Sequence, residues 1–336
     1  MLTVLRTYDY REDGLRLMTD GIVPVLTAIQ SEATVCFPAR HWDGGPHVDL
    51  NLGYEPLPAV RLAELRTMLS AAADESATWS PEHYQQRTRR LAALEGRTTW
   101  QPAPHPHGAT EVETLPDQPT ATTVLRHRLL TGMALLLAAL PSGDAAAARA
   151  QAPGLALRWM AAAASVYPGG IRFGSLSFRS HAEAFLASRP DGAEQRARFA
   201  AAYERFRPQL ERLAELALAE PDRLPGHAQC RAVYRELGAP EMRTEIDALL
   251  TGTAHRTQPA PAALSAFHQQ LAERGFGRHE PEGYRPFRVL VNWLYEALQW
   301  LGVTPLNRYL YCHCLATVID DRLGERWQDR IAVRPV

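Results

Sequence analysis

Hydrophobic and polar residues alternate in the first sixth of the chain. Residues 47–54 place Val48, Leu50 and Leu52 on one face and polar side chains on the other, which predicts a half-buried strand. Two further strands are predicted, over residues 3–8 and 33–38. The segment 34–54 therefore predicts a hairpin, and its connection carries Arg40, His41 and Trp42.

Helical spacing, with apolar residues three or four positions apart, dominates the remaining chain. It predicts helices over residues 11–29, 58–73, 81–94, 123–140, 145–166, 193–219, 241–250 and 262–273. Residues 97–119 are rich in Pro, Thr and His without a period, and we expect a long mobile loop there. Residues 171–178 predict a strand, and the following Ser180-His181-Ala-Glu183 is typical of a capped helix start.

The C-terminal segment 291–327 carries the most informative pattern. It predicts two apolar helices joined by the turn Gly302–Val303–Thr304–Pro305. Titratable and polar side chains interrupt the apolar sequence: Asn292, Tyr295, Glu296, Tyr309, Tyr311 and His313. Packing alone does not require such residues, whereas a site that moves protons does.

Taken together, these elements predict an α+β fold, a small N-terminal antiparallel sheet with a large set of packed helices. The 336 residues suffice for one large domain or two closely joined ones, and we expect a single domain over residues 1–336. The N-terminal sequence shows no secretory signal, and no apolar run is long enough to span a bilayer. We therefore expect a cytoplasmic protein that does not bind membranes.

Composition excludes several reaction classes. All 36 cationic residues are Arg, so neither a Schiff-base lysine nor the lysine of a P-loop or a protein kinase is available. A net charge of −1 gives no indication of nucleic-acid binding. The four cysteines show no CxxC pair, and His105 and His107 have no nearby carboxylate or thiol. We expect neither a metal site nor a cofactor.

Two helix faces carry the candidate chemistry. Asn292 and Tyr295 share one face with Arg288 and Gln299, and Tyr309 and His313 share another with Asp320. Arg288, Gln299 and Asp320 are interpreted as ordinary solvated positions. Tyr309, His313 and Tyr295 are the candidate acid–base residues, because His and a tuned Tyr both move protons near neutral pH. No nucleophile, metal or dinucleotide motif accompanies them, a pattern that fits elimination, isomerisation or cyclisation.

Three segments together resemble a known family. They are Cys36-Phe-Pro-Ala-Arg-His-Trp-Asp-Gly-Gly-Pro-His-Val-Asp-Leu, Ser177-Phe-Arg-Ser-His-Ala-Glu-Ala-Phe, and the hairpin from Asn292 to Trp327. They are similar, in this order and over nearly the whole chain, to the C-terminal elimination domain of class I lanthipeptide dehydratases in its stand-alone thiopeptide form. The resemblance implies that fold.

The resemblance also implies one of two activities. Elimination members remove glutamate from glutamylated Ser and tend to carry Arg residues after a Pro-His pair, whereas this strand reads Pro46-His-Val-Asp49-Leu-Asn51. The difference favours the thiomuracin-type pyridine synthase, which joins two dehydroalanines by a formal aza-cycloaddition and then expels water and the leader peptide. Its implied partner is a ribosomally made precursor with a leader and a dehydrated, azole-containing core.

For this reaction we expect Tyr309 and His313 to donate or relay protons, with Tyr295 and Asn292 close by. Substrate-binding roles are expected for Asn292, Arg40, His41, His181 and Tyr311. Two alternatives stay open: a glutamate-eliminating partner of a tRNA-dependent Ser dehydratase, and a non-catalytic subunit that binds the leader peptide. Precursor sequence, ring size and oligomeric state do not follow from the sequence.

Overall fold

The computed structural model describes residues 2–11, 14–32, 35–53, 57–73, 79–94, 97–115, 119–257, 264–275, 280–281 and 283–332. The chain forms two compact units. We call Met1–Pro153 with Glu296–Gly302 the sheet unit, and Gly154–Tyr295 with Val303–Val336 the helical unit. Each unit is described by itself, and the expected single domain stays a prediction.

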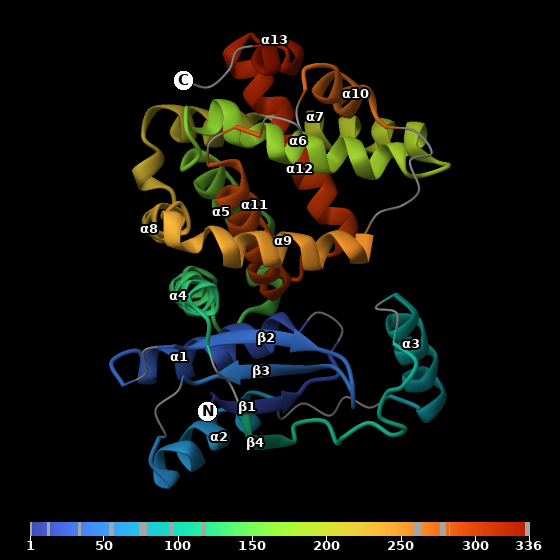
Figure 1. The fold of residues 1–336 in the computed structure, drawn as a ribbon. Coiled ribbons are helices and arrows are strands. Elements are labelled where there is room, and N and C mark those ends of the chain that lie inside the picture. Colours follow the sequence, from blue (N-terminus) through green and yellow to red (C-terminus); the bar gives the residue numbers. More distant parts are fainter. Residues whose placement is uncertain are drawn as a thin grey trace. The chain divides into compact units, whose positions relative to one another are not determined.

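The sheet unit is built on four antiparallel strands in the order β2-β3-β1-β4 (Figure 1). Their bounds are β1 Leu2–Tyr8, β2 Phe37–His41, β3 His47–Asn51 and β4 Thr110–Leu115. This sheet and the helices that follow confirm the α+β fold. Strand β4 corrects the loop that we expected over residues 97–119, because a polar edge strand with Glu at alternate positions shows little hydrophobic alternation.

Each strand presents two faces. Leu5 of β1 pairs with Leu50 of β3 on one face, next to α2, whose Ser70 donates a hydrogen bond to Thr110. Arg6 and Asp49 pair on the other face. All five residues of β3 are buried, so the expectation of a half-buried strand is wrong. The polar positions of β3 are retained inside because they bond to one another and to β1.

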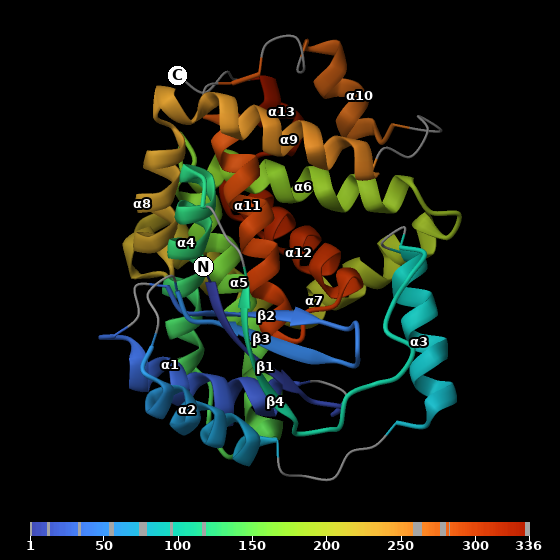
Figure 2. The same cartoon turned by 60° about the horizontal axis from the view of Figure 1, so that its bottom comes forward.

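The remaining elements of the sheet unit are helical. They are a π-helix at Leu17–Ile22, α1 Val23–Ile29, α2 Ala59–Ala72, α3 Pro81–Leu94, α4 Ala121–Leu135, and 3₁₀ turns at Leu136–Ala139 and Gln299–Leu301. Helices α1 and α2 lie side by side (Figure 2). Pro24 is the second residue of α1, which continues directly from the π-helix through Ile22 and Val23 in helical conformation.

The helical unit contains the longer helices. They are α5 Ala145–Ser165 (which begins in the sheet unit), α6 Ile171–Ala187, α7 Gly192–Ala219, α8 His227–Leu237, α9 Arg243–Thr257, α10 Ala266–Glu273, α11 Tyr284–Leu298 (whose last turn lies in the sheet unit), α12 Pro305–Leu323 and α13 Trp327–Ala332. Helix α12 packs mainly against α6 and α7, rather than against the preceding α11 as the hairpin pattern suggested. Across the described residues, no helix is both long and apolar enough to span a membrane.

Helix α6 replaces the strand expected over residues 171–178. Its buried positions follow the helical period, and Gly174 lets the backbones of α5 and α6 approach closely: a Cβ there would lie 2.0 Å from the carbonyl oxygen of Ala164. Ser180 therefore lies inside the helix and caps nothing. It instead bonds the His268 ring at 2.9 Å. Tertiary packing overrides the strand-like local composition.

Candidate active site

A histidine and a tyrosine from different helices meet in the helical unit. The Tyr295 hydroxyl of α11 lies 2.5 Å from Nδ1 of His181 on α6 and 3.4 Å from the Cys312 sulfur on α12. Tyr295 is 9% exposed, Cys312 is buried, and His181 is partly exposed. The three helices thus hold a phenol, an imidazole and a thiol in one hydrogen-bonded group with an open side at His181.

Burial keeps this group uncharged at neutral pH. Desolvation raises the pKa of Tyr295 well above 10, and Cys312 adds to the rise. Burial lowers the pKa of His181 to about 4, with Arg308 and Arg288 lowering it further. A neutral imidazole beside a neutral phenol offers a proton acceptor and a proton donor at hydrogen-bond distance.

Arg308 lies against the same tyrosine. Its guanidinium carbon is 4.7 Å from the ring centre of Tyr295 and 5.0 Å from that of Tyr309, and a terminal nitrogen donates to the Tyr309 hydroxyl at 3.2 Å. Among the described residues no carboxylate pairs with Arg308, and its buried Nε has no hydrogen-bond partner. Two tyrosine rings and one tyrosine hydroxyl thus hold this cation.

A row of aromatic rings connects Tyr309 to His313. Tyr309 stacks on Phe185 at 4.2 Å, Phe185 stacks on Phe199 at 6.2 Å, and Phe199 lies 5.8 Å from His313. Tyr309 is only partly buried. The expected grouping of Tyr295 with Tyr309 is therefore found through Arg308, whereas His313 lies further along the same aromatic row.

His313 is in a charged but closed setting. It is 7% exposed, and its Nδ1 is buried without a partner among the described residues. Burial lowers its pKa to about 4; Arg179 and Arg196 lower it further, and Glu183 opposes them. His313 is thus neutral at pH 7, and the role of proton donor or relay stays a prediction.

An ion network lies behind His313. Asp320 binds Arg179 at 2.6 Å and also binds Arg330, which is fully buried on α13, and Glu183 binds Arg196 at 2.6 Å. Asp320 is therefore a partly buried ion-pair partner, and the expectation of an ordinary solvated position is wrong. A pattern of charges along a helix does not reveal that the next helix will cover them.

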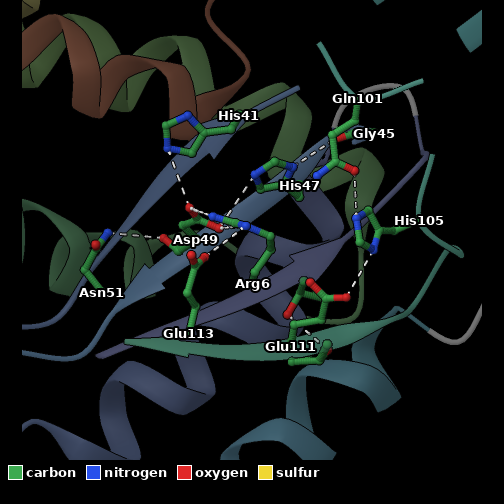
Figure 3. Close-up of polar contacts among 12 residues, drawn as sticks. Arg6, His41, Gly45, His47, Asp49, Asn51, Gln101, His105, Glu111 and Glu113 are labelled. Carbon is green, nitrogen blue, oxygen red and sulfur yellow. Dashed lines mark hydrogen bonds and ion pairs between the residues drawn. The ribbon is translucent and has the colours of Figure 1, made fainter. Parts of the chain in front are cut away.

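The polar face of the sheet carries a second set of charged residues (Figure 3). Arg6 donates to both oxygens of Asp49, at 2.8 and 3.0 Å, and lies 3.1 Å from Glu113. His41 and His47 lie 3.8 and 3.7 Å from the Asp49 carboxylate. Burial lowers the pKa of His47 to about 4. Asp49 thus has its own cation, and this face is largely self-paired.

The other predicted site residues are more scattered. Asn292 is exposed and makes no polar contact within the described part of the chain. Tyr311 is partly buried, and burial raises its pKa. Arg40 of the sheet unit donates to the Gln299 carbonyl at 3.1 Å, and His41 is largely exposed. Their substrate-binding roles stay predictions.

The histidines of the Pro-rich segment have structural contacts. His105 stacks on Tyr8 at 4.4 Å and lies 3.0 Å from Glu111, while His107 accepts the backbone N–H of Tyr10. Within the described residues, no group of three or more His, Cys, Asp or Glu could hold a metal ion.

Sequence reasoning missed Arg308 and Cys312 and gave His181 a minor role. Arg308 immediately precedes Tyr309 at the start of the apolar part of its helix, and this position is the signal in the sequence that could have indicated it. Cys312 was expected to be a buried thiol, which it is, but its contact with Tyr295 follows only from the packing of the helices.

The molecule is thus an α+β protein whose helical unit holds a neutral histidine–tyrosine pair beside an arginine that has no carboxylate partner among the described residues. Its fold is that of the pyridine synthase TbtD from thiomuracin biosynthesis: the two chains superpose with a TM-score of 0.71 at 22% identity, covering 96% of this chain and 99% of TbtD. A second solved structure, TsrL, matches with a TM-score of 0.60 at 17% identity, over 99% of this chain and 97% of that one.

The tRNA-dependent lantibiotic dehydratase MibB from Microbispora sp. 107891 is more distant. It has a TM-score of 0.42 and 15% identity, and the match covers 96% of this chain but 28% of MibB. No protein-family model and no curated protein sequence matches the chain. The resemblance seen in the sequence is confirmed at the level of the fold.

Proposed function

We propose that this protein is a cofactor-independent pyridine synthase of thiopeptide biosynthesis. Its substrate is a ribosomally made precursor peptide in the cytoplasm, with a leader and a dehydrated, azole-containing core. Two dehydroalanines join in a formal 4+2 aza-cycloaddition, and loss of water and of the leader peptide leaves a pyridine at the centre of a macrocycle. The fold shared with TbtD supports this class of reaction.

The observation that carries the proposal is the contact between His181 and Tyr295. The diene half of the reaction is an amide in its iminol form, so one proton leaves the amide nitrogen and one reaches the oxygen. A neutral imidazole 2.5 Å from a neutral phenol suits this exchange. Holding the two dehydroalanines together supplies on the order of 7–11 kcal/mol in favourable intramolecular cases.

The sheet supports the cyclase over the glutamate-eliminating alternative. A glutamyl carboxylate would need free cations on β3, but that strand offers Asp49 and Asn51. Arg6 on β1 is the nearest cation to Asp49 in the described contacts, and Asp49 and Glu113 already pair with it. An arginine with two carboxylate partners is a poor receptor for a third.

The test uses two peptides. The purified protein is incubated with a bis-dehydroalanine precursor and, separately, with a glutamylated one, each with and without a chelator, and masses are recorded. We expect the first peptide alone to react, giving a product lighter by water and the leader, with or without chelator. Glutamate release from the second would favour the eliminating partner. Binding without product would favour a leader-binding subunit. Loss of turnover on chelation, restored by one metal, would contradict the proposal that the enzyme needs no cofactor.

We further propose where the leader binds. Strand β4 is an edge of the sheet, because β1 is its single partner among the described strands. A groove of about 760 Å³ lies beside it, lined by Val112 of β4 and by α2 residues that include Arg66 and Ser70. An added peptide strand could pair with the free backbone of β4 and place its side chains in this groove.

A matched pair of variants tests this location. Val112 and Val124 belong to the same unit and are 46% and 45% exposed, but Val112 lines the groove and Val124 lies on α4. We expect Val112→Asp to weaken binding of the isolated leader at least tenfold, since it replaces an apolar contact of the groove by a negative charge. Val124→Asp should leave binding unchanged. Equal leader affinities for both variants would exclude the groove.

A further inference from the structure

Arg308 differs from four other arginines of the helical unit in what neutralises it. Arg179, Arg196, Arg285 and Arg330 each have a carboxylate partner within ion-pair distance. Arg308 has none among the described residues, although it is partly buried and its Nε is wholly covered. Its contacts are two tyrosine rings and one tyrosine hydroxyl.

An unpaired, partly desolvated guanidinium is costly, and π-faces offset only part of that cost. The cost falls when an anion arrives. One terminal nitrogen of the planar Arg308 guanidinium already donates a hydrogen bond to the Tyr309 hydroxyl. No described residue accepts a hydrogen bond from its other N–H groups, which suit an oxygen that carries negative charge. The guanidinium lies over the ring of Tyr295, whose hydroxyl bonds His181.

We propose that Arg308 forms an anion-binding site that receives the oxyanion of the reacting amide. This inference rests on the proposed function. When the amide proton moves to the Tyr295–His181 pair, the electron pair of the N–H bond forms the C=N bond and the carbonyl π electrons move onto oxygen. Arg308 holds that oxygen until it is protonated to the iminol, so its contact is strongest where the charge develops.

Arg207 provides the matched control. Its guanidinium lies 5.1 Å from the ring of Tyr203 and its Nε is likewise buried without a partner, but Glu204 and Asp321 pair with it, at 2.5 and 4.0 Å. The two arginines therefore share the aromatic contact and the buried Nε. They differ in the carboxylates that neutralise Arg207.

The first test is turnover of the bis-dehydroalanine precursor by Arg308→Met, Arg308→Lys and Arg207→Met, with melting recorded for each. We expect Arg308→Met to lower kcat by about 100-fold or more while precursor affinity changes little. Arg308→Lys should fall in between, because an ammonium keeps the charge without the planar fork. Arg207→Met should keep the wild-type kcat. A folded Arg308→Met protein with wild-type kcat would overturn the proposal.

The second test does not depend on turnover. In the full-length protein with ¹⁵N-labelled arginine, the Nε–H signal that disappears in Arg308→Met is followed during titration with formate as a carboxylate probe. We expect a saturable shift of that signal and none for Arg207. Absence of a saturable shift would overturn the anion site. A saturable shift in a protein that makes no pyridine would instead keep the site and reject the proposed function.

Discussion

Arg6 of the sheet unit and Arg308 of the helical unit are neutralised in opposite ways. On the sheet face Arg6 makes a two-bond contact with Asp49 and a further ion pair with Glu113, and nearby Arg11 makes two bonds to Asp9. In the helical unit, Arg308 faces tyrosine rings without an acidic partner among the described residues. The first arrangement pairs its charges internally, and the second is the one that we propose an anion to complete.

The difference distinguishes polar groups that stabilise the fold from polar groups that can still react with a ligand. Polar groups that satisfy one another hold strands in register and leave no free valence for a ligand. A neutral His181–Tyr295 pair with an unneutralised cation beside it can still accept a proton and a negative charge. The comparison predicts that sheet-face variants will change stability and that variants of the helical group will change rate.

The largest effect is expected for His181→Phe. Phenylalanine keeps a ring against Tyr295 but removes the nitrogen that lies 2.5 Å from its hydroxyl, so turnover should fall by about 100-fold or more. His268→Phe is the control, because the nitrogens of His268 bond Ser265 and Ser180 and not Tyr295. Pyridine formation at similar rates by both folded variants would contradict a role of His181 in catalysis.

Asp49→Ala tests whether the charged residues of the sheet face contribute to stability rather than to rate. It leaves Arg6, whose side chain is 24% exposed, with Glu113 alone, and we expect about 2 kcal/mol less stability in urea unfolding. The folded variant should turn over at the wild-type rate. A large loss of kcat without loss of stability would show that the sheet face takes part in the chemistry.

A pH dependence of stability is expected from His313. Its pKa is about 4 in the folded protein against an ordinary 6.5, so the unfolded state binds more protons between these values. Stability should therefore fall as the pH drops from about 6.5 to about 4, by up to roughly 3 kcal/mol for this residue. Urea unfolding across this range should show a shallower slope for His313→Phe; an unchanged slope would contradict the buried neutral state.

The smallest effect is expected for Tyr309→Phe. The sequence made Tyr309 a leading acid–base candidate, but its hydroxyl receives one hydrogen bond from Arg308, and its stacking on Phe185 does not need the oxygen. We expect about a fivefold loss of kcat, the value of one ordinary hydrogen bond. A loss as large as that of His181→Phe would return Tyr309 to the centre of the mechanism.

The sequence reached the fold class because its evidence was local. Alternation at Val48, Leu50 and Leu52 marked the strand β3, and helical spacing marked most of the long helices. The prediction from sequence was wrong over residues 171–178, where close packing at Gly174 favours a helix. It was also wrong at β4, an edge strand whose polar residues obscure the alternation of apolar and polar positions. Both failures concern contacts with distant segments, which local composition does not record.

The candidate site was reached only in part for the same reason. Tyr295 stood out as a polar residue in an apolar helix, but its neighbours His181 and Cys312 come from α6 and α12. The adjacency of α11 and α12 in sequence suggested that they pair, whereas α12 packs mainly against α6 and α7. The catalytic roles of Tyr309 and His313 stay predictions.

The most direct test is the rate of pyridine formation by Tyr295→Phe beside that of Tyr203→Phe. Both substitutions remove one phenolic hydroxyl in the helical unit: Tyr295 loses its contact with His181, and Tyr203 loses its 2.5 Å bond to Asp321. With melting recorded on the same samples, we expect Tyr295→Phe to be at least about 100-fold slower than wild type and Tyr203→Phe to keep the wild-type rate. Well-folded Tyr295→Phe protein that forms pyridine at the wild-type rate would contradict the assignment of the chemistry to this pair.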